Sequence, residues 1–302
     1  MWFKNLQTFL LKEPFEWTPE ALGERLEAHR FHPCAAQEPV SQGWTAPART
    51  EGAPLVASAH GFHLICLRRE EKLLPASVVN DVLAERVEAI EAAEGRPPRR
   101  KERIRLKEDI FQELLPRAFS RNTRLYACID PQARRLLVDT PSATKAEDLV
   151  SLLRKGLGSL PARPLAVNRP PVDLMTRWLQ GEELPRDLEI LDQCELREPG
   201  EEGGIVRCRR QDLFSDEVRA HLDAGKQVVQ LALEWEERLG FVLTDPPAFK
   251  RLRFDDLVLE EAAEAGGDDE AARLDADLAL MGLELQRFLD RMLELMGGPV
   301  EG

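Results

Sequence analysis

The chain has the sequence pattern of short strands, except for one helical stretch that begins and ends near helix-breaking residues. Apolar residues recur at helical spacing from Ala76 to Ile90, and the pattern stops at Gly95, which two prolines follow. A second helical pattern begins near Ile110 and ends at Pro116, because proline cannot continue a helix. These patterns predict a helical hairpin inserted between strands, with the intervening basic run at its tip.

Strand patterns precede and follow this hairpin. We expect strands at residues 3–11, 61–67, 125–129, 135–138, 189–196, 205–210, 227–235, 241–244 and 249–254. Residues 33–54, rich in Pro, Gly, Ala and Ser, are expected to be loop. Helix starts are predicted by the caps at Thr18 and Ser215 and by a capping box from Thr144 to Glu147. The repeated strand and capped helix leave an internal duplication open.

The fold class that follows is α+β. We expect a mixed or antiparallel sheet body, a helical-hairpin insertion and a C-terminal helix whose apolar stripe runs from Leu278 to Met296. The predicted parts are a first sheet segment, a helical tip with the basic run, a second sheet segment and an acidic helical tail, at residues 1–74, 75–121, 122–254 and 255–302.

Charge is distributed unevenly along the chain. The 302 residues carry 41 Lys and Arg against 54 Asp and Glu, a formal net charge of −13. Residues 255–302 hold fourteen of these acids and three of the bases, so the remainder is close to neutral. Residues 96–107 contain seven bases and one acid. An acidic chain of this kind can still bind an anionic partner locally, although its total charge argues against one.

The sequence predicts a cytoplasmic protein. The N-terminus lacks the basic and apolar regions of a signal peptide, and no run of about 18 apolar residues could span a membrane. The five cysteines are scattered without a CxxC pair, which favours reduced, mostly buried thiols. We expect no membrane association and no cofactor.

Catalytic motifs are weak. A phosphate-binding loop with Lys-Ser/Thr and a GxSxG elbow are both missing from the sequence. The run Glu70-Glu71-Lys72 resembles a metal-nuclease element but lacks a nearby upstream Asp, and the acids at Asp255 and Asp256 belong to a long acidic run. We therefore expect no catalytic residue and no metal ligand, and a Mg²⁺-dependent nuclease stays as an alternative.

Three basic elements can contact phosphates. The first is the run from Arg96 to Lys107 with Arg117 and Arg121. In the second, Arg207 and Arg209 share one face of a predicted strand, and Arg210 and Gln211 follow. In the third, Arg251 and Arg253 share a face. Each element alone is typical of an exposed surface, but the three together favour nucleic-acid binding.

Several segments of the chain resemble the RdgC family of bacterial recombination-associated proteins. The matching segments follow the same order over nearly the whole chain: Trp2–Leu6, Arg69–Pro75, Leu114–Arg121, Lys145–Asp148, Leu157–Pro161 and Arg210–Leu213. The resemblance implies a ring-shaped homodimer of curved subunits that encloses duplex DNA without marked sequence preference. It also implies that the protein restrains RecA-dependent recombination.

The resemblance also suggests residue roles. Phe119 would be an apolar knob that enters a pocket on the other subunit, although a Phe in this context is more often a core residue. Arg210 and Gln211 would face DNA. Arg210 stands where the family pattern has lysine, which keeps the charge, and Gln211 could instead be a turn residue before Ser215.

The leading hypothesis is a nucleoid-associated protein, not an enzyme, whose partners are double-stranded DNA and a second copy of itself. RecA is a functional partner, with direct contact left open. The predicted DNA-binding residues are Arg96, Arg99, Arg100, Lys101, Arg103, Arg117, Arg121, Arg207, Arg209, Arg210, Gln211, Arg251 and Arg253. The alternatives are the nuclease and a protein-interaction module that acts on RecA without DNA.

Overall fold

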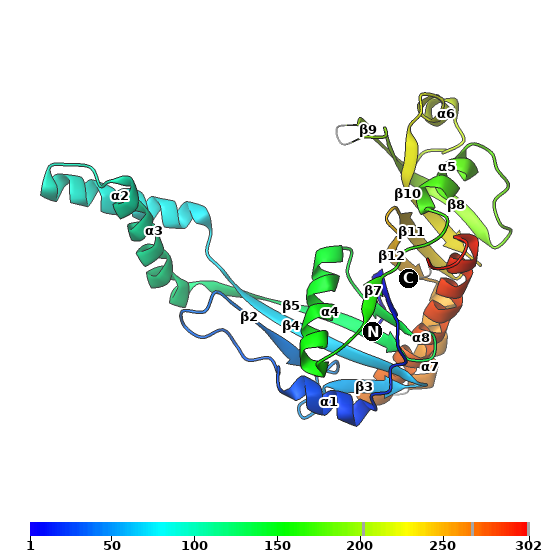
Figure 1. The fold of residues 1–302 in the computed structure, drawn as a ribbon, viewed down its shortest axis with the longest axis horizontal. Helices are drawn as coiled ribbons and strands as arrows, with labels where there is room; N and C mark the ends of the chain where they lie inside the picture. The colour runs from blue at the N-terminus through cyan, green and yellow to red at the C-terminus, as the bar shows by residue number, and fades with distance from the viewer. Residues whose placement is uncertain (201–202, 267–268, 301–302) are drawn as a thin grey trace. The chain divides into compact units, whose positions relative to one another are not determined.

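The chain divides into two compact units (Figure 1), and the computed structural model describes residues 1–200, 203–266 and 269–300. Unit 1 comprises Met1–Leu26, Ala46–Ile65 and Tyr126–Gly302, and unit 2 comprises Glu27–Thr45 and Cys66–Leu125. Two long strands, β4 (Phe62–Leu73) and β5 (Phe119–Asp130), each contribute residues to both units. Helices and antiparallel strands alternate irregularly, so the fold class is α+β as predicted.

Unit 1 is built on an antiparallel sheet. Its main strands follow the order β6-β1-β12-β11-β10-β8-β9. Their bounds are Arg135–Val138, Asn5–Leu11, Ala248–Phe254, Leu239–Thr244, Gln227–Trp235, Leu188–Arg197 and Ile205–Arg209, respectively. The short strand β7 (Ala162–Pro164) pairs with β1, and β3 (Val56–Ala59) pairs with the first residues of β4.

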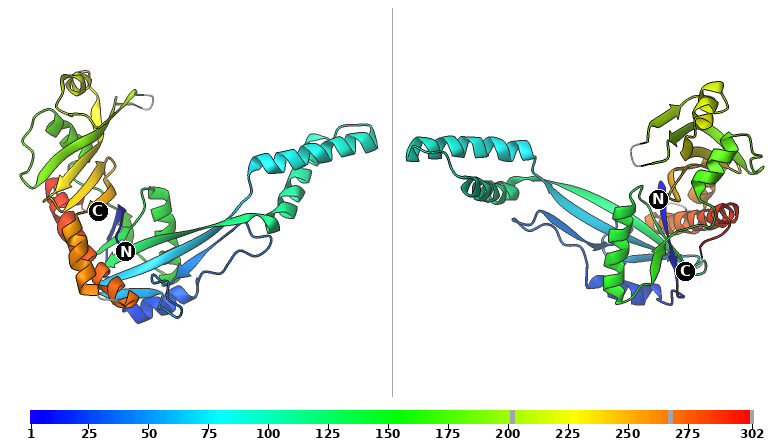
Figure 2. Two further views of the ribbon diagram at one scale, coloured as in Figure 1. Left: turned by 180° about the vertical axis from the view of Figure 1, so that it is seen from behind. Right: turned by 45° about the horizontal axis from the view of Figure 1, so that its top comes forward.

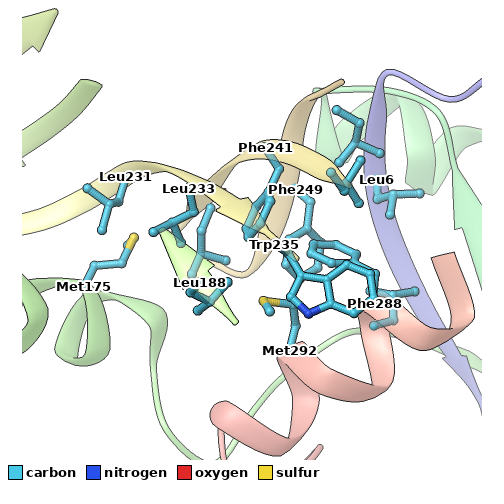
Figure 3. Close-up of a cluster of buried hydrophobic side chains, with 14 of the residues drawn as sticks. Leu6, Met175, Leu188, Leu231, Leu233, Trp235, Phe241, Phe249, Phe288 and Met292 are labelled. Atoms are coloured by element: carbon cyan, nitrogen blue, oxygen red, sulfur yellow. The ribbon is translucent and has the colours of Figure 1, made fainter. Parts of the chain in front are cut away.

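Helix α8 (Glu270–Leu295) covers this sheet with the apolar stripe predicted from the sequence. Phe288 is fully buried, and its ring centroid lies 4.8 Å from that of Phe241, 4.9 Å from that of Phe249 and 5.7 Å from that of Trp235 (Figure 3). Edge-to-face aromatic contacts add to the hydrophobic stabilisation from burial. The other helices of unit 1 are α1 (Pro19–Glu27, its last residue beyond the unit boundary), α4 (Ala143–Leu157), α5 (Pro171–Leu179), α6 (Asp216–Asp223) and α7 (Asp256–Gly266).

Unit 2 carries the helical hairpin. Helices α2 (Ala76–Glu94) and α3 (Arg100–Leu114) lie side by side in both views of Figure 2. They bury a small cluster centred on Val79, Leu83 and Ile110. Gly95 ends α2 in the left-handed conformation, with φ of 69°, as the sequence predicted. A 3₁₀ turn, η1 (Leu115–Arg117), contains Pro116 and leads into β5.

One prediction in unit 2 was wrong. Residues 33–54 are not all loop, because β2 (Val40–Thr45) pairs antiparallel with β4 from Cys66 to Glu71. This strand has little apolar alternation, so its pattern did not indicate it. Gly43 explains the local geometry, since a Cβ there would lie 2.6 Å from the backbone of Phe31. Only glycine permits this close approach.

Several boundaries also differ from the predictions. Helix α3 begins at Arg100, so residues 100–107 of the basic run are helical instead of preceding the helix. Helix α4 is capped by Ser142, whose hydroxyl accepts the N–H of Lys145 at 3.4 Å, two residues before the predicted cap. The predicted strand at residues 61–67 continues as β4 to Leu73. Within the described residues, none of the helices is long and apolar enough to cross a bilayer.

Candidate nucleic-acid interface

The first basic element extends from the α2–α3 connection into the first turns of α3. Arg96 is neutralised locally, because its guanidinium lies 2.8 Å from the Glu94 carboxylate and 3.0 Å from that of Glu102. Glu102 also accepts the backbone N–H of Arg99 at 2.7 Å, which stabilises the start of α3. The following bases, Arg100, Lys101, Arg103 and Arg105, are exposed on successive faces of the helix. The helix therefore presents positive charge to solvent.

The segment after α3 exposes an aromatic side chain between two arginines. Phe119 is the first residue of β5 and is 86% exposed. Arg117 is exposed, and Arg121 forms an ion pair with Glu71 on β4 at 3.0 Å. The alternative that Phe119 is a core residue does not hold in this structure, and its role at a dimer contact stays a prediction. Single exposed apolar side chains are common on protein surfaces, so the exposure of Phe119 permits an interface role without demonstrating one.

A groove on the hairpin was not predicted from the sequence. It has a volume of about 460 Å³ and is mostly apolar. Val79, Phe111 and Ile104 lie in its wall, and the Ile104 side chain is 52% exposed. Its lining residues are Leu74, Ala76, Val79, Ile104, Lys107, Glu108, Phe111 and Gln112. In the sequence, Ile104 could have indicated this groove, because it is an apolar residue within the basic run.

The second and third basic elements meet on one face of the unit 1 sheet. Arg207 and Arg209 on β9 and Arg251 on β12 line the same depression, of about 250 Å³. The polar side chains of Gln193 and Gln230 line it as well. Arg251 reaches across the sheet and donates from Nη1 to Oε1 of Gln193 at 3.0 Å. Residues more than forty positions apart in the sequence therefore converge.

Local backbone geometry explains this convergence. On β9, Arg207 and Arg209 are exposed while Cys208 is buried, as the alternation predicted. On β12, the register with β11 shifts between Val242 and Gly240, and Arg251 has φ of 53°. The exposure pattern still follows the alternation expected for Arg251 and Arg253, since both are exposed and Leu252 between them is buried. The Arg253 guanidinium lies 4.0 Å from the Glu234 carboxylate.

One buried carboxylate organises the arginines at this edge. Glu195 is buried, and its carboxylate lies 2.7 Å from Nε of Arg207 and 2.7 Å from Nη2 of Arg197. Burial alone would raise the pKa of Glu195, but the hydrogen bonds from the two arginines outweigh it and lower the pKa. Glu195 therefore stays ionised and holds the exposed side chain of Arg207 in place.

The two residues that follow β9 differ in their surroundings. Arg210 is exposed and has φ of 54°, a left-handed conformation that turns the chain out of the strand. Gln211 is half-buried and donates from Nε2 to the Glu217 carboxylate of α6 at 2.7 Å. This contact fits the turn role that the sequence left open for Gln211, and its DNA-facing role stays a prediction.

The residues of the nuclease alternative make structural contacts. Hydrogen bonds from the Ser120 side chain and the backbone N–H of Cys34 lower the pKa of Glu70. Glu71 pairs with Arg121, and Nζ of Lys72 donates to the carbonyl oxygens of Ala35 and Ala36 at 2.8 and 2.6 Å. In the part of the chain that the structure describes, no three His, Cys, Asp or Glu side chains gather closely enough to hold a metal ion.

Comparison with known proteins identifies relatives along the whole chain. The family model described as "Putative exonuclease, RdgC" matches residues 1–299. The recombination-associated protein RdgC of Pseudomonas aeruginosa is 47% identical over 299 residues, which cover 99% of this chain and 98% of that protein. The proteins of the same name from Aeromonas hydrophila and Pseudomonas putida are 47% identical over 298 residues and 45% identical over 299 residues, with the same coverage.

Proposed function

Because this chain belongs to the RdgC family of recombination-associated proteins, we propose that it binds double-stranded DNA without marked sequence preference and thereby restrains RecA-dependent recombination. The observation that carries the proposal is the depression in which Arg207, Arg209 and Arg251 meet. Guanidinium groups bind phosphate oxygens with two parallel hydrogen bonds, so three of them on one face suit a phosphate backbone.

The chemistry of this depression favours contacts with the backbone over readout of bases. Phosphate contacts position a protein on duplex DNA but carry no sequence information. The amides of Gln193 and Gln230 offer further hydrogen bonds to phosphate or sugar oxygens. On the hairpin, the exposed Arg100, Lys101 and Arg103 supply a second group of positive charges. Sequence-tolerant binding is the expected result.

The dimer that we propose is a ring closed by Phe119. Each chain carries both an exposed aromatic side chain and an apolar groove in unit 2, which suits a twofold contact in which each copy's Phe119 enters the partner's groove. In the ring that the family resemblance implies, the two copies enclose the duplex. DNA held inside such a ring is less accessible to RecA, and the proposal needs no direct contact with RecA. DNA binding would also place the protein at the nucleoid in the cytoplasm.

A salt titration of DNA affinity tests the binding proposal. Full-length protein is titrated with a fluorescent duplex at several salt concentrations, and log Kd is plotted against log salt concentration. Each lost phosphate contact reduces the slope by about 0.9. We expect the triple variant Arg207→Gln, Arg209→Gln and Arg251→Gln to flatten the slope by up to about 2.7.

The matched control is Arg287→Gln, because Arg287 pairs with Glu236 at 3.0 Å and lies outside the depression. Its slope should equal that of the unaltered protein. Equal slopes for the triple variant and the unaltered protein would overturn the assignment of these arginines. Affinity that does not depend on salt, or no retention of DNA at low salt, would overturn DNA binding and favour the protein-interaction module.

A second experiment addresses ring closure. Truncation of an interface Phe removes burial worth about 1.5–3 kcal/mol, so Phe119→Ala should weaken dimerisation at least about tenfold in analytical ultracentrifugation. DNA affinity should fall with it. Phe119→Leu keeps an apolar side chain and should retain most of the dimer affinity. Equal association of the Phe119→Ala variant and the unaltered protein would contradict the knob assignment.

Cleavage assays separate binding from nuclease activity. Labelled linear DNA is incubated with the protein and Mg²⁺ or Mn²⁺, and we expect the DNA to stay intact. Sustained cleavage that Glu71→Ala abolishes would replace the binding proposal with the nuclease alternative.

A further inference from the structure

Two cysteines of the arginine-bearing edge face each other across adjacent strands. In the antiparallel register of β8 and β9, Cys194 pairs directly with Cys208. Opposite residues in antiparallel strands have Cα atoms about 4.5–5.5 Å apart, which lies within the range of about 4.4–6.8 Å that disulfides require. Both cysteines are in the free thiol form. The backbone therefore already has a geometry that permits a cross-strand disulfide.

The two thiols are also shielded from solvent. Cys194 is 6% exposed and Cys208 is 7% exposed. Burial, the charge that Cys208 would carry and a side-chain hydrogen bond with Cys208 together raise the pKa of Cys194 to about 12. Little thiolate is present at neutral pH, so reaction is expected to be slow there and faster at alkaline pH. Side chains of directly paired residues in antiparallel strands lie on the same face of the sheet, so the pairing places the two thiols next to each other.

The other three cysteines have different surroundings. In their strand pairings, Cys66 faces Thr45 and Cys128 faces Leu137. Cys34 is partly exposed, and its thiol donates to the carbonyl oxygen of Glu70 at 3.5 Å. Cys194 and Cys208 are therefore the cysteines that the sheet register brings together.

We propose that Cys194 and Cys208 form a reversible oxidation site, at which hydrogen peroxide converts the two thiols into a disulfide that ties β9 to β8. One thiol loses its proton and attacks a peroxide oxygen as the thiolate. The O–O bond breaks, and the hydroxide that leaves takes up the proton, so that a sulfenic acid and water result. The second thiol loses its proton and attacks the sulfenic sulfur as the thiolate. The S–S bond forms, the S–O bond breaks, and the hydroxide that leaves takes up this proton as a second water. One peroxide is reduced by two electrons, and each sulfur is oxidised by one.

The cross-link would restrain the strand that carries Arg207 and Arg209. β9 is the last strand in the order of the unit 1 sheet, so β8 is its strand neighbour among the described residues. A disulfide in the middle of this pair prevents β9 from separating while leaving the exposed arginine side chains in place. The oxidation site does not depend on DNA binding, so it can be tested separately from the proposed function.

The experiment treats the full-length protein with hydrogen peroxide at pH 9 and counts thiols after denaturation. We expect the count to fall from five to three and to return to five after reduction with dithiothreitol. Peptide mapping without reductant should show the Cys194 peptide joined to the Cys208 peptide, with a mass lower by two hydrogens than the sum of the two. Because this map uses the unaltered protein, it does not depend on whether a variant folds.

Variants give matched controls. Cys194→Ala and Cys208→Ala should each abolish the cross-linked peptide, whereas Cys34→Ala should leave it unchanged. Five thiols that persist under conditions that oxidise free dithiothreitol would overturn the proposal. A map that joins other cysteines, or that joins two chains instead of one, would also overturn it.

Discussion

Helix α8 and the α2–α3 hairpin differ in how far their apolar residues are buried and their charged residues are paired. Helix α8 buries its apolar stripe against the unit 1 sheet, and its charged residues pair with other parts of unit 1, as Arg291 does with Asp187 and Glu284 with Arg238. The hairpin buries only a small cluster and leaves its bases and a groove exposed. One region is suited to stability and the other to binding.

This difference changes the meaning of the net charge. The acids of the C-terminal segment dominate the total of −13, but several of them are already engaged by arginines of the same chain. Among the described residues, the ion pairs of the basic run from Arg96 to Lys107 involve Arg96. Total charge therefore describes solubility, whereas the placement of exposed positive charge indicates where an anionic partner would bind.

The largest loss of stability is expected when a side chain in the core under α8 is truncated. Phe288→Ala removes an aromatic ring that contacts three others, so we expect the free energy of unfolding to fall by about 3–5 kcal/mol. Urea denaturation followed by circular dichroism measures it. Val78→Ala in α2 is the control, and this 42% exposed side chain should change stability by no more than about 0.5 kcal/mol. Equal losses in the two variants would remove the contrast between the regions.

A smaller loss of stability is expected when an ion pair of α8 is removed. Nε and Nη2 of Arg291 donate to the two carboxylate oxygens of Asp187 at 2.7 and 2.9 Å, which lowers the pKa of Asp187. We expect Asp187→Asn to cost about 1 kcal/mol at neutral pH. Because the folded pKa lies below the unfolded value, this contribution is present above the unfolded pKa, about 3.9, and is lost as the pH falls through the folded pKa.

Urea denaturation at neutral pH and at about pH 2.5 tests this dependence, and the difference between variant and unaltered protein should shrink in acid. Glu294→Gln is the control, because this carboxylate is 71% exposed although it also contacts Arg291. A difference that stays constant with pH would mean that Asp187 acts through packing instead of charge.

The smallest effect, a change in the salt dependence of DNA binding, is expected from single substitutions in the hairpin. Arg103→Gln removes an exposed charge and should reduce the salt slope of DNA binding by about 0.9, with stability unchanged within about 0.5 kcal/mol. Arg96→Gln should reduce the slope less, because Arg96 already pairs with Glu94 and Glu102. The same DNA titration measures both. A larger loss for Arg96→Gln would show that intramolecular pairing does not decide which bases bind.

The elements that could be predicted were those with a strong local pattern. The stripe from Leu278 to Met296 predicted α8, and the residues 227–235 predicted β10 with its observed bounds. β2 was missed because Val40–Thr45 contains a glycine and little apolar alternation. Its position depends on pairing with β4 and on the close approach at Gly43, which are contacts between distant residues.

The candidate site could be predicted residue by residue but not as an arrangement. Alternation correctly placed Arg207 and Arg209 on one exposed face. It could not place Arg251 near them, because that position depends on the order of the strands in the sheet and on a hydrogen bond to Gln193. The ion pairs of Glu195 could not be predicted either, because the sequence around a single acid does not indicate which arginines it will contact.

The position of β9 at the end of the sheet order has a consequence for aggregation. The open edge of a terminal strand can pair with a strand of another molecule, and proteins commonly prevent this by placing charged side chains there. Arg207 and Arg209 supply such charges, so the side chains proposed to attract DNA also discourage edge-to-edge assembly. Selection for DNA binding and selection for solubility would then act on the same two positions.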